Sequence, residues 1–388
     1  MPAKAAIAGL GITEMGKIYG RTNVDFAAEA VALALDDAGL EKSDLDGLLV
    51  NANSSFDNIG PRLQMSLGLR DLTFVNVMNS FGSTAGMMLE YASYAVSHGR
   101  AKAVACLFAD APLKEKVSSS AAYAGNRLKG AVGMAGLRTA HGLFGANPSY
   151  ALGARRHMHE FGTTQDQLGA IAVGQRKWAL MNPRAQMKKE MTLEDYHASR
   201  WVVEPFHLFD CGLVSNGSVC VIVTSVERAQ SLQQPPVYLR GFGQIAPGDN
   251  QSADRNPLLD TGAKTSGEQA LRQAGIELAD VDFLELYDCY TYTVLCTIED
   301  YGFCAKGEGG PFVEDGKLGP GGSLPTNTGG GQLSSFYMWG FTPVSEAVIQ
   351  LRGQGGERQL EKNDHALVSG NGGVLNYHST TIMSKHAG

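Results

Sequence analysis

Proton-bearing side chains and glycine loops gather in the last third of the chain. The run 284–295, LELYDCYTYTVL, contains Tyr287, Asp288, Tyr290 and Tyr292, and the run 327–340, NTGGGQLSSFYMWG, contains Tyr337. A phenol has a reference pKa of about 10, yet it can act as a general acid or base when it is held in place. These residues are therefore candidates for proton transfer, although a tyrosine at a strand end also commonly serves only to fill space.

The glycine runs 329–331 and 370–373 admit two interpretations. They can be tight turns, which glycine favours because it has no Cβ atom. Alternatively, their backbone N–H groups can face a developing negative charge, as the preorganised donors of an oxyanion hole do. The sequence leaves both interpretations open, and Gly330 and Gly372 are the candidates for the second.

The cysteines do not form a recognisable metal or disulfide pattern. They are Cys106, Cys211, Cys220, Cys289, Cys296 and Cys304. None of them stands at a CxxC spacing, which argues against a zinc site or a disulfide framework. We expect buried, reduced thiols and no metal site in this chain, because free cysteine is among the most buried residue types.

Composition limits the classes of function. The chain has 388 residues, of which 44% are hydrophobic and 18% charged, and its net charge is −7. A nucleic-acid binder would show a basic footprint instead. No apolar run approaches the ~20 residues that cross a bilayer, and the amino terminus has the character of a first strand rather than of a signal peptide. We therefore expect a cytoplasmic protein with neither a nucleic-acid nor a membrane partner.

The elements that must position the candidate residues alternate between strand and helix. Short β-rich runs and helical patterns follow one another at Lys4–Leu10, Val24–Ala38, Gly47–Val50, Phe74–Val77, Gly82–Ser97 and Ala103–Phe108. Such alternation is typical of β-α-β units, in which helices cover a mixed or parallel sheet. The predicted fold class is α/β.

An internal repeat divides the chain. The segment 34–50, ALDDAGLEKSDLDGLLV, matches the segment 270–286, ALRQAGIELADVDFLEL, with eight identities in seventeen positions at a constant offset of 236. Each copy predicts a helix that ends at a glycine, Gly39 or Gly275, followed by an acidic turn and a strand. We expect two similar α/β halves, 1–235 and 236–388. The first half contains an insertion at about 111–210, and insertions of this size often carry lids or binding loops.

Five landmarks give the chain a resemblance to the thiolases of the sterol-carrier-protein type. They are VNVMNSFGSTAG at 75–86, ALGARRHMHEFGTT at 151–164, the two tyrosine-containing runs, and LVSGNGG at 367–373. The resemblance runs over essentially the whole chain. It implies the thiolase fold, in which two similar halves build an αβαβα succession of layers.

The sequence departs from the thiolase pattern at each position that carries the chemistry. Asn79 replaces the nucleophilic cysteine, and Tyr287 and Tyr337 replace the two catalytic histidines. The late cysteine that shuttles a proton would fall within 369–373, where none is present. Thiolysis requires a nucleophile that accepts the acyl group, and an asparagine cannot act as one. Proton transfer without acyl transfer remains.

A thiolase-like chain with a tyrosine pair is similar to the steroid side-chain retro-aldolases. The resemblance implies cleavage of a β-hydroxyacyl-CoA into a ketone or aldehyde and a shorter acyl-CoA, with Tyr287 and Tyr337 as acid and base. It assigns substrate orientation to Asn79, Gly330 and Gly372, and leaves Asp288, Tyr290 and Tyr292 as secondary candidates. It also implies a homodimer, no cofactor of this chain beyond the substrate's coenzyme A, and a separate OB-fold subunit whose ribbon holds zinc.

Two other functions stay open on the sequence. The chain could be a β-ketoacyl-CoA thiolase that uses Cys289 or another displaced thiol. It could also be a carrier that binds acyl-CoA or sterol without changing it, in which case the tyrosines would have a structural role only.

Overall fold

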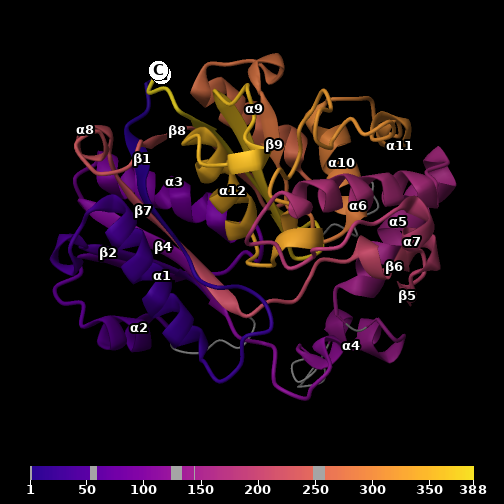
Figure 1. Ribbon diagram of the computed structural model, residues 1–388, viewed down its shortest axis with the longest axis horizontal. Coiled ribbons are helices and arrows are strands. Elements are labelled where there is room, and N and C mark those ends of the chain that lie inside the picture. The colour runs from indigo at the N-terminus through magenta and orange to yellow at the C-terminus, as the bar shows by residue number, and fades with distance from the viewer. Residues whose placement is uncertain (1, 53–58, 124–132, 144, 248–257) are drawn as a thin grey trace.

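The computed structural model describes residues 2–52, 59–123, 133–143, 145–247 and 258–388. Nine strands form one mixed sheet in the order β3-β2-β4-β7-β1-β8-β11-β10-β9 (Figure 1). Their bounds are β1 Ala5–Ile12, β2 Gly47–Asn51, β3 Phe74–Met78, β4 Ala103–Asp110, β7 Gly217–Ser225, β8 Val237–Ile245, β9 Phe283–Glu285, β10 His365–Gly372 and β11 Tyr377–Ser384. The two short strands β5 Trp201–Val203 and β6 Phe206–His207 pair separately.

Helices connect and cover these strands. Their bounds are α1 Asn23–Ala38, α2 Ile59–Leu67, α3 Thr84–Ser97, α4 Gly133–Ala140, α5 Asn147–Phe161, α6 Gln165–Leu180, α7 Leu193–Ala198, α8 Val226–Ala229, α9 Ala263–Ala274, α10 Thr291–Tyr301, α11 Gly309–Phe312 and α12 Phe341–Leu351. A short π-helical turn, η6, spans Gly331–Ser335. The strands and helices expected within 4–108 are all present, with ends shifted by one to two residues. Within the described residues, no helix is long and apolar enough to cross a membrane.

The two halves repeat one strand arrangement outward from the centre of the sheet. In the first half β1 pairs with β7 and β7 with β4, both antiparallel, and β4 pairs with β2 in parallel. In the second half β8 pairs with β11 and β11 with β10, both antiparallel, and β10 pairs with β9 in parallel. The halves meet where β1 pairs with β8. The expectation of two similar α/β halves is confirmed, while the division at 235/236 stays a prediction.

The repeated segments also share their local structure. Helices α1 and α9 each end at a left-handed glycine, Gly39 with φ of 69° and Gly275 with φ of 70°. Each helix lies close to its strand, because a Cβ atom on Gly11 of β1 or Gly243 of β8 would come within about 2 Å of a carbonyl oxygen of the helix. Only glycine permits such an approach of backbone to backbone.

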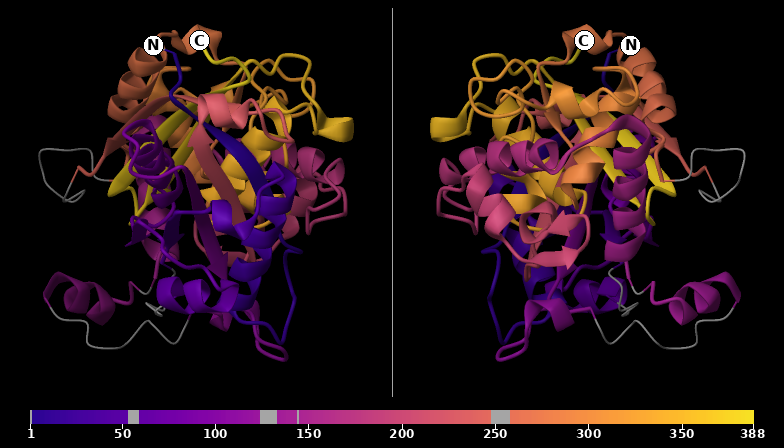
Figure 2. Two further views of the ribbon diagram at one scale, coloured as in Figure 1. Left: turned by 90° about the vertical axis from the view of Figure 1, so that its left-hand side faces the viewer. Right: turned by 90° about the vertical axis from the view of Figure 1, so that its right-hand side faces the viewer.

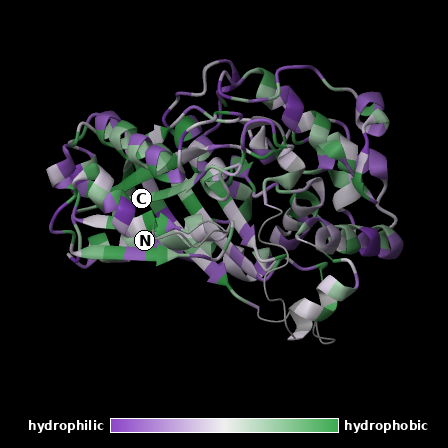
Figure 3. Cartoon of the chain, turned by 90° about the horizontal axis from the view of Figure 1, so that it is seen from below, coloured by the Kyte–Doolittle hydropathy of each residue, from purple (hydrophilic) through white to green (hydrophobic). Residues whose placement is uncertain are grey.

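The helices form layers on either side of the strands. Helix α1 covers one face of β1, β7 and β4, and α9 covers β8 and β11. Helices α3 and α12 pack against strands of both halves and so lie between them (Figures 1 and 2). The apolar residues that alternate along the strands enter two separate cores, one on each side of the first half. The strands in the left part of Figure 3 are accordingly largely green. This is the expected αβαβα succession.

The excursion expected at about 111–210 is mainly helical where it is described. It contains α4 to α7 and the β5–β6 pair. Helices α5, α6 and α7 lie together beside α10 and α11 of the second half (Figure 1). The excursion therefore contributes side chains next to the tyrosine-rich run that leads into α10.

Candidate active site

Tyr287 and Tyr337 meet through their hydroxyl groups, although fifty residues of chain separate them. The two oxygens lie 3.0 Å apart. Tyr287 follows β9 and is only 4% exposed, whereas Tyr337 lies half-buried in the loop between η6 and α12. The Tyr337 backbone N–H donates to Ser215 Oγ at 3.0 Å. The two residues therefore form a hydroxyl pair that belongs to two separate segments of the second half.

The start of α3 forms one wall of this pair. A Cβ atom on Gly82 would lie 2.1 Å from a ring carbon of Tyr287, so the Tyr287 ring rests directly on the Gly82 backbone. Ser83, the residue before α3, donates its hydroxyl to the Gly370 carbonyl of β10 at 3.1 Å. The tyrosine pair consequently lies beside the amino terminus of a helix, where the helix dipole favours negative charge.

Asn79 lies in the same loop but does not start the helix. The expected helix began at Gly82; the observed α3 begins at Thr84, and Asn79 is exposed five residues earlier. Its Oδ1 accepts the Phe81 N–H at 3.1 Å. A Cβ atom on Gly372 would lie 2.3 Å from the Ser80 carbonyl oxygen, so Gly372 packs on this loop as well. Asn79 and Gly372 are thus brought together at the edge of the site.

Gly330 uses its backbone N–H inside its own loop, which favours a structural role over the expected oxyanion role. Its N–H donates to the Asn327 carbonyl at 2.8 Å, and its Cα packs against Ala179 of α6. Its φ of 95° marks it as the left-handed residue that precedes η6. The turn interpretation therefore applies to Gly330, because its only donor already has a partner inside the loop.

The secondary candidates use their polar atoms in the surrounding structure. The Asp288 carboxylate accepts the N–H groups of Gln332 and Leu333 at 2.8–3.1 Å and so fixes the start of η6. Tyr290 donates its hydroxyl to Asn147 Oδ1, and Tyr292 donates to the Leu258 carbonyl. None of these contacts joins the three residues to the hydroxyls of the Tyr287–Tyr337 pair.

Four polar residues near the pair escaped the sequence analysis. Tyr150 of α5 donates its hydroxyl to Asn371 Oδ1 at 3.1 Å, and Asn371 Nδ2 donates to the Tyr287 carbonyl at 3.4 Å. Tyr123 donates its hydroxyl to Asp110 Oδ2 at 2.9 Å. Asn371 stands inside the glycine run 370–373 and offered a signal there. The other three had none, because β4, α5 and the turn that contains Tyr123 approach the site only in the folded chain.

Burial decides the protonation of the site. It raises the pKa of both Tyr287 and Tyr337 well above the ordinary value for tyrosine. It raises the pKa of Asp288 to about 7 and that of the Cys289 thiol to about 12. At neutral pH both phenols therefore hold their protons and can donate them. Cys289 is 8% exposed and remains a thiol, which makes it a poor nucleophile.

The cysteines are reduced throughout the chain, as expected. All six are free, and Cys106, Cys220, Cys289 and Cys296 are buried. Cys296 lies within 4.8 Å of donor atoms of His157 and Glu299, a grouping that could in principle hold a metal ion. However, His157 bonds Thr163 and Glu299 through its two nitrogens, and Lys306 lies 3.2 Å from the same Glu299 oxygen. An ammonium group at this position opposes a second cation.

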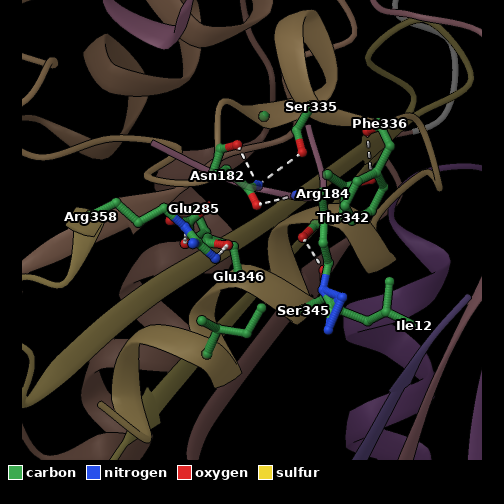
Figure 4. Close-up of a pocket in the computed structure, with 13 residues that line it drawn as sticks. Ile12, Asn182, Arg184, Glu285, Ser335, Phe336, Thr342, Ser345, Glu346 and Arg358 are labelled. Atoms are coloured by element: carbon green, nitrogen blue, oxygen red, sulfur yellow. Dashed lines mark hydrogen bonds and ion pairs between the residues drawn. The ribbon is translucent and has the colours of Figure 1, made fainter. Parts of the chain in front are cut away.

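A small cavity lies behind the Tyr337 loop (Figure 4). Its wall includes Phe336 and a buried charged cluster in which Arg358 binds both carboxylate oxygens of Glu346, at 2.8 and 3.0 Å. Glu285 faces the same cluster, and burial followed by the nearby Glu346 carboxylate raises its pKa well above the usual range. Thr328 donates its hydroxyl to Glu285 at 2.8 Å. The cluster supports the loop that precedes η6, because the Thr328 N–H also donates to Glu285.

Comparison with known proteins places this geometry in a family. Residues 245–385 match the family model described as thiolase C-terminal domain-like. The steroid side-chain-cleaving aldolase of Thermomonospora curvata is 37% identical, with 91% of each chain covered. The 17-hydroxy-3-oxo-4-pregnene-20-carboxyl-CoA lyase of Mycobacterium tuberculosis is 35% identical over 96% of this chain and 98% of the relative.

Solved structures agree with these sequence matches. The structure titled Ltp2-ChsH2(DUF35) aldolase superposes with a TM-score of 0.86 at 36% identity, covering 99% of this chain and 98% of that one. Human mitochondrial 3-ketoacyl-CoA thiolase superposes with a TM-score of 0.68 at 15% identity, covering 98% of both chains, and so shows the fold alone. The chain therefore belongs to the thiolase superfamily, as a sterol-carrier-protein-type thiolase-like member similar to steroid side-chain-cleaving aldolases.

Proposed function

We propose that this protein is an acyl-CoA lyase that performs a retro-aldol cleavage. Its substrate is a β-hydroxyacyl-CoA with a bulky, steroid-type tail, and its products are a ketone or aldehyde and a shorter acyl-CoA. The observation that carries the proposal is the contact between the Tyr287 and Tyr337 hydroxyls at 3.0 Å. The similarity to two proteins named as a side-chain-cleaving aldolase and a carboxyl-CoA lyase supports the substrate class.

The proposed reaction needs proton transfer and charge stabilisation, without an acyl-enzyme. The β-hydroxyl loses its proton, the bond between the α- and β-carbons breaks, and its electrons form a thioester enolate. A protonated tyrosine then delivers a proton to the α-carbon. Asn79 lies in the loop before α3, and Gly372, at the end of β10, packs on that loop. We propose that the two residues orient the thioester there. Tyr287 and Tyr337 suit the acid role because burial keeps both protonated.

The thiolase alternative is disfavoured by the state of the thiols. Cys289 lies near the tyrosine pair, but burial raises its pKa to about 12, and asparagine occupies the position that the resemblance gives to the nucleophile. Treatment with iodoacetamide separates the two functions. Loss of turnover on alkylation would favour a thiol nucleophile, whereas the aldolase should keep its activity.

We propose that the protein acts as a homodimer beside a DUF35-type subunit. The structure with a TM-score of 0.86 carries such a subunit in its title, and the resemblance assigns an OB-fold and a zinc ribbon to that partner. For the homodimer, the support is the edge strand β3, where Val75 and Val77 are 49% and 45% exposed. Phe81, which follows the strand, is 44% exposed. Apolar side chains on an unpaired strand edge favour pairing with a second chain.

Product analysis tests the proposed function. The purified chain, with and without a DUF35-type subunit, is incubated with a β-hydroxyacyl-CoA that carries a polycyclic tail, and the products are identified by mass spectrometry. A ketone or aldehyde together with a shortened acyl-CoA supports the lyase. Intact substrate after long incubation in both mixtures would favour the carrier instead, and cleavage of a β-ketoacyl-CoA that requires free coenzyme A would favour a thiolase.

A further inference from the structure

In a stepwise retro-aldol cleavage a group must hold the released proton, and two phenols that already carry protons need a further acceptor to do so. The β-hydroxyl releases a proton before the α-carbon receives one, so the enzyme must hold it in between. Burial keeps both Tyr287 and Tyr337 protonated at neutral pH. A phenol that already holds its proton can accept another only by passing its own onward. The need for a separate proton acceptor rests on the proposed function.

The end of β4 lies directly beside the Tyr337 loop. Asp110 is the last residue of β4, and its strand partner in β7 is Gly217. Two residues before Gly217 stands Ser215, whose Oγ accepts the Tyr337 N–H at 3.0 Å. A hydrogen bond thus ties the neighbouring strand to the backbone of Tyr337.

A ring contact links the same two segments a second time. Phe108 of β4 stacks on Trp339 with ring centroids 4.7 Å apart. Side chains two residues apart along a strand share one face, so Asp110 points to the same side of the sheet as Phe108. Trp339 is likewise two residues from Tyr337. The Asp110 carboxylate, which is 6% exposed, is therefore directed toward the loop that carries Tyr337.

Tyr123 is a hydrogen-bond partner of the Asp110 carboxylate. Its hydroxyl donates to Asp110 Oδ2 at 2.9 Å, while Oδ1 accepts the Ala111 N–H at 2.9 Å. Tyr123 and Tyr337 also interact electrostatically, as do Asp110 and Tyr337, and both interactions disfavour a negative charge on the tyrosines. These effects agree with the strand pairing and the Phe108–Trp339 contact, which bring the end of β4 beside the Tyr337 loop.

We propose that Asp110, together with Tyr123, is the proton acceptor of the site and works through Tyr337. As the carbon–carbon bond breaks, the β-hydroxyl proton moves to Tyr337 and an equivalent proton arrives on Asp110. Tyr287 protonates the α-carbon of the enolate, and the proton on Asp110 returns through Tyr337 to Tyr287. The number of protons on the enzyme is the same before and after one turnover, and no other reactant is required.

Asp288 and Cys289 are also titratable groups close to Tyr337, and they suit this role less well. Both oxygens of Asp288 accept backbone N–H groups of η6, and a backbone amide does not pass a proton onward. The Cys289 thiol is protonated at neutral pH, since burial raises its pKa to about 12. Both Asp110 oxygens also accept hydrogen bonds, but the partner of Oδ2 is the Tyr123 hydroxyl, which can itself pass a proton onward.

The variants Asp110→Asn and Tyr123→Phe test the proposal in the complex with the DUF35-type subunit. Asparagine keeps an oxygen that can accept the Ala111 N–H, and phenylalanine keeps the Tyr123 ring. We expect each variant to lower kcat by roughly 10²-fold, the size of a general acid–base contribution, with KM and the melting temperature nearly unchanged. In the Tyr337→Phe background, Asp110→Asn should cost little more, because groups that act as a unit are non-additive.

A second buried carboxylate provides matched controls. Asp210 accepts the Tyr196 hydroxyl at 2.8 Å, the same type of contact at a different place. Asp210→Asn and Tyr196→Phe should change stability to a similar degree and leave kcat within a few-fold. If the wild-type complex does not cleave the substrate, the proposed function fails. If it does cleave and both Asp110→Asn and Tyr123→Phe retain near-wild-type kcat, this inference alone is wrong. Should Asp110→Asn fail to fold, kcat of Tyr123→Phe decides.

Discussion

The backbone of each tyrosine of the pair is fixed by its own hydrogen bond to a serine. The position of one hydroxyl therefore does not depend on the other hydroxyl. The Tyr337 N–H donates to Ser215 Oγ at 3.0 Å, and the Tyr287 N–H approaches Ser369 Oγ at 3.4 Å. The Tyr287 ring rests on Gly82. Because rings and backbones are fixed separately, removal of one hydroxyl oxygen should leave the rest of the site in place.

The Tyr→Phe variants of the pair separate a chemical role from a structural one. We expect Tyr287→Phe and Tyr337→Phe each to lower turnover by roughly 10²-fold or more, with little change in substrate affinity. The double variant should lose far less than the sum of the two free-energy changes. A structural role would instead lower the melting temperature, through a lost hydrogen bond of about 0.5–1.5 kcal/mol, and leave turnover nearly intact. Measurement of turnover, substrate affinity and melting temperature on the two single variants and the double variant distinguishes the chemical role from the structural one.

At the level of elements, α3 and η6 each place one tyrosine. The loop before α3 supports the Tyr287 ring, and η6 leads the chain into the Tyr337 loop. The start of α3 bonds β10 through Ser83 and Gly370, and η6 bonds Asp288, a residue far from it in sequence. Changes in them should therefore disturb the site without removing a reacting atom.

Gly82→Ala should inactivate the enzyme through the position of the Tyr287 ring. The new methyl group would lie 2.1 Å from one ring carbon and 2.4 Å from the Asn371 carbonyl oxygen, so the ring must move. We expect turnover to fall at least as far as in Tyr287→Phe. Gly174→Ala in α6 is the matched control, because its nearest contact would be 3.8 Å and alanine favours a helix. Normal turnover of Gly82→Ala would show that the ring position is unimportant.

Asp288, whose carboxylate holds the start of η6, should make the stability of the folded chain depend on pH. Burial raises the pKa of Asp288 from 3.8 to about 7, so the folded chain binds this proton more tightly than the unfolded chain. The contribution of Asp288 is therefore fully present below pH ~4 and is lost as pH rises through about 7. Asp288→Asn cannot titrate, and it should lower the melting temperature more at pH 5 than at pH 7.5. Equal losses at the two pH values would contradict the assignment.

The whole molecule connects the site to the edge of the sheet. Strand β3 is the edge strand of the sheet on the side of the first half. The loop that follows it carries Asn79 and Phe81 before the chain enters α3. Phe81 also contacts Trp339, with ring centroids 5.9 Å apart. A second chain that pairs along β3 would therefore cover the loop that borders the tyrosine pair.

Charge on the β3 edge should separate the proposed dimer. Val75→Lys places an ammonium group on a residue that is 49% exposed, and its desolvation opposes pairing. We expect the variant to elute at the mass of a monomer when size-exclusion chromatography is combined with light scattering. Leu152→Lys changes a residue of α5 that is 53% exposed, outside the β3 edge, and should leave the mass unchanged. A dimer of unchanged strength in Val75→Lys would place the interface elsewhere.

The sequence determined those features that depend on neighbouring residues. Helix α1 follows from its apolar spacing, its capping box at Thr22 and Asp25, and the left-handed Gly39. The repeat at 270–286 shares the glycine at the end of the helix and the acidic turn that follows it, and so two similar halves could be expected. The positions of Tyr287 and Tyr337 came from motifs in single segments. These signals lie within a few turns of the chain, where spacing and side-chain chemistry decide the structure.

Only the tertiary structure decided which of these residues meet. Gly330 and Gly372 have the same type and similar surroundings in sequence, yet one donates its N–H inside its own loop and the other packs on the loop of Asn79. Asp110 and Tyr123 gave no signal, because the end of β4 lies beside the Tyr337 loop only through the pairing of β4 with β7, over a hundred residues apart in sequence. Contacts of this kind are set by how strands and helices cross in space, which local periodicity does not contain.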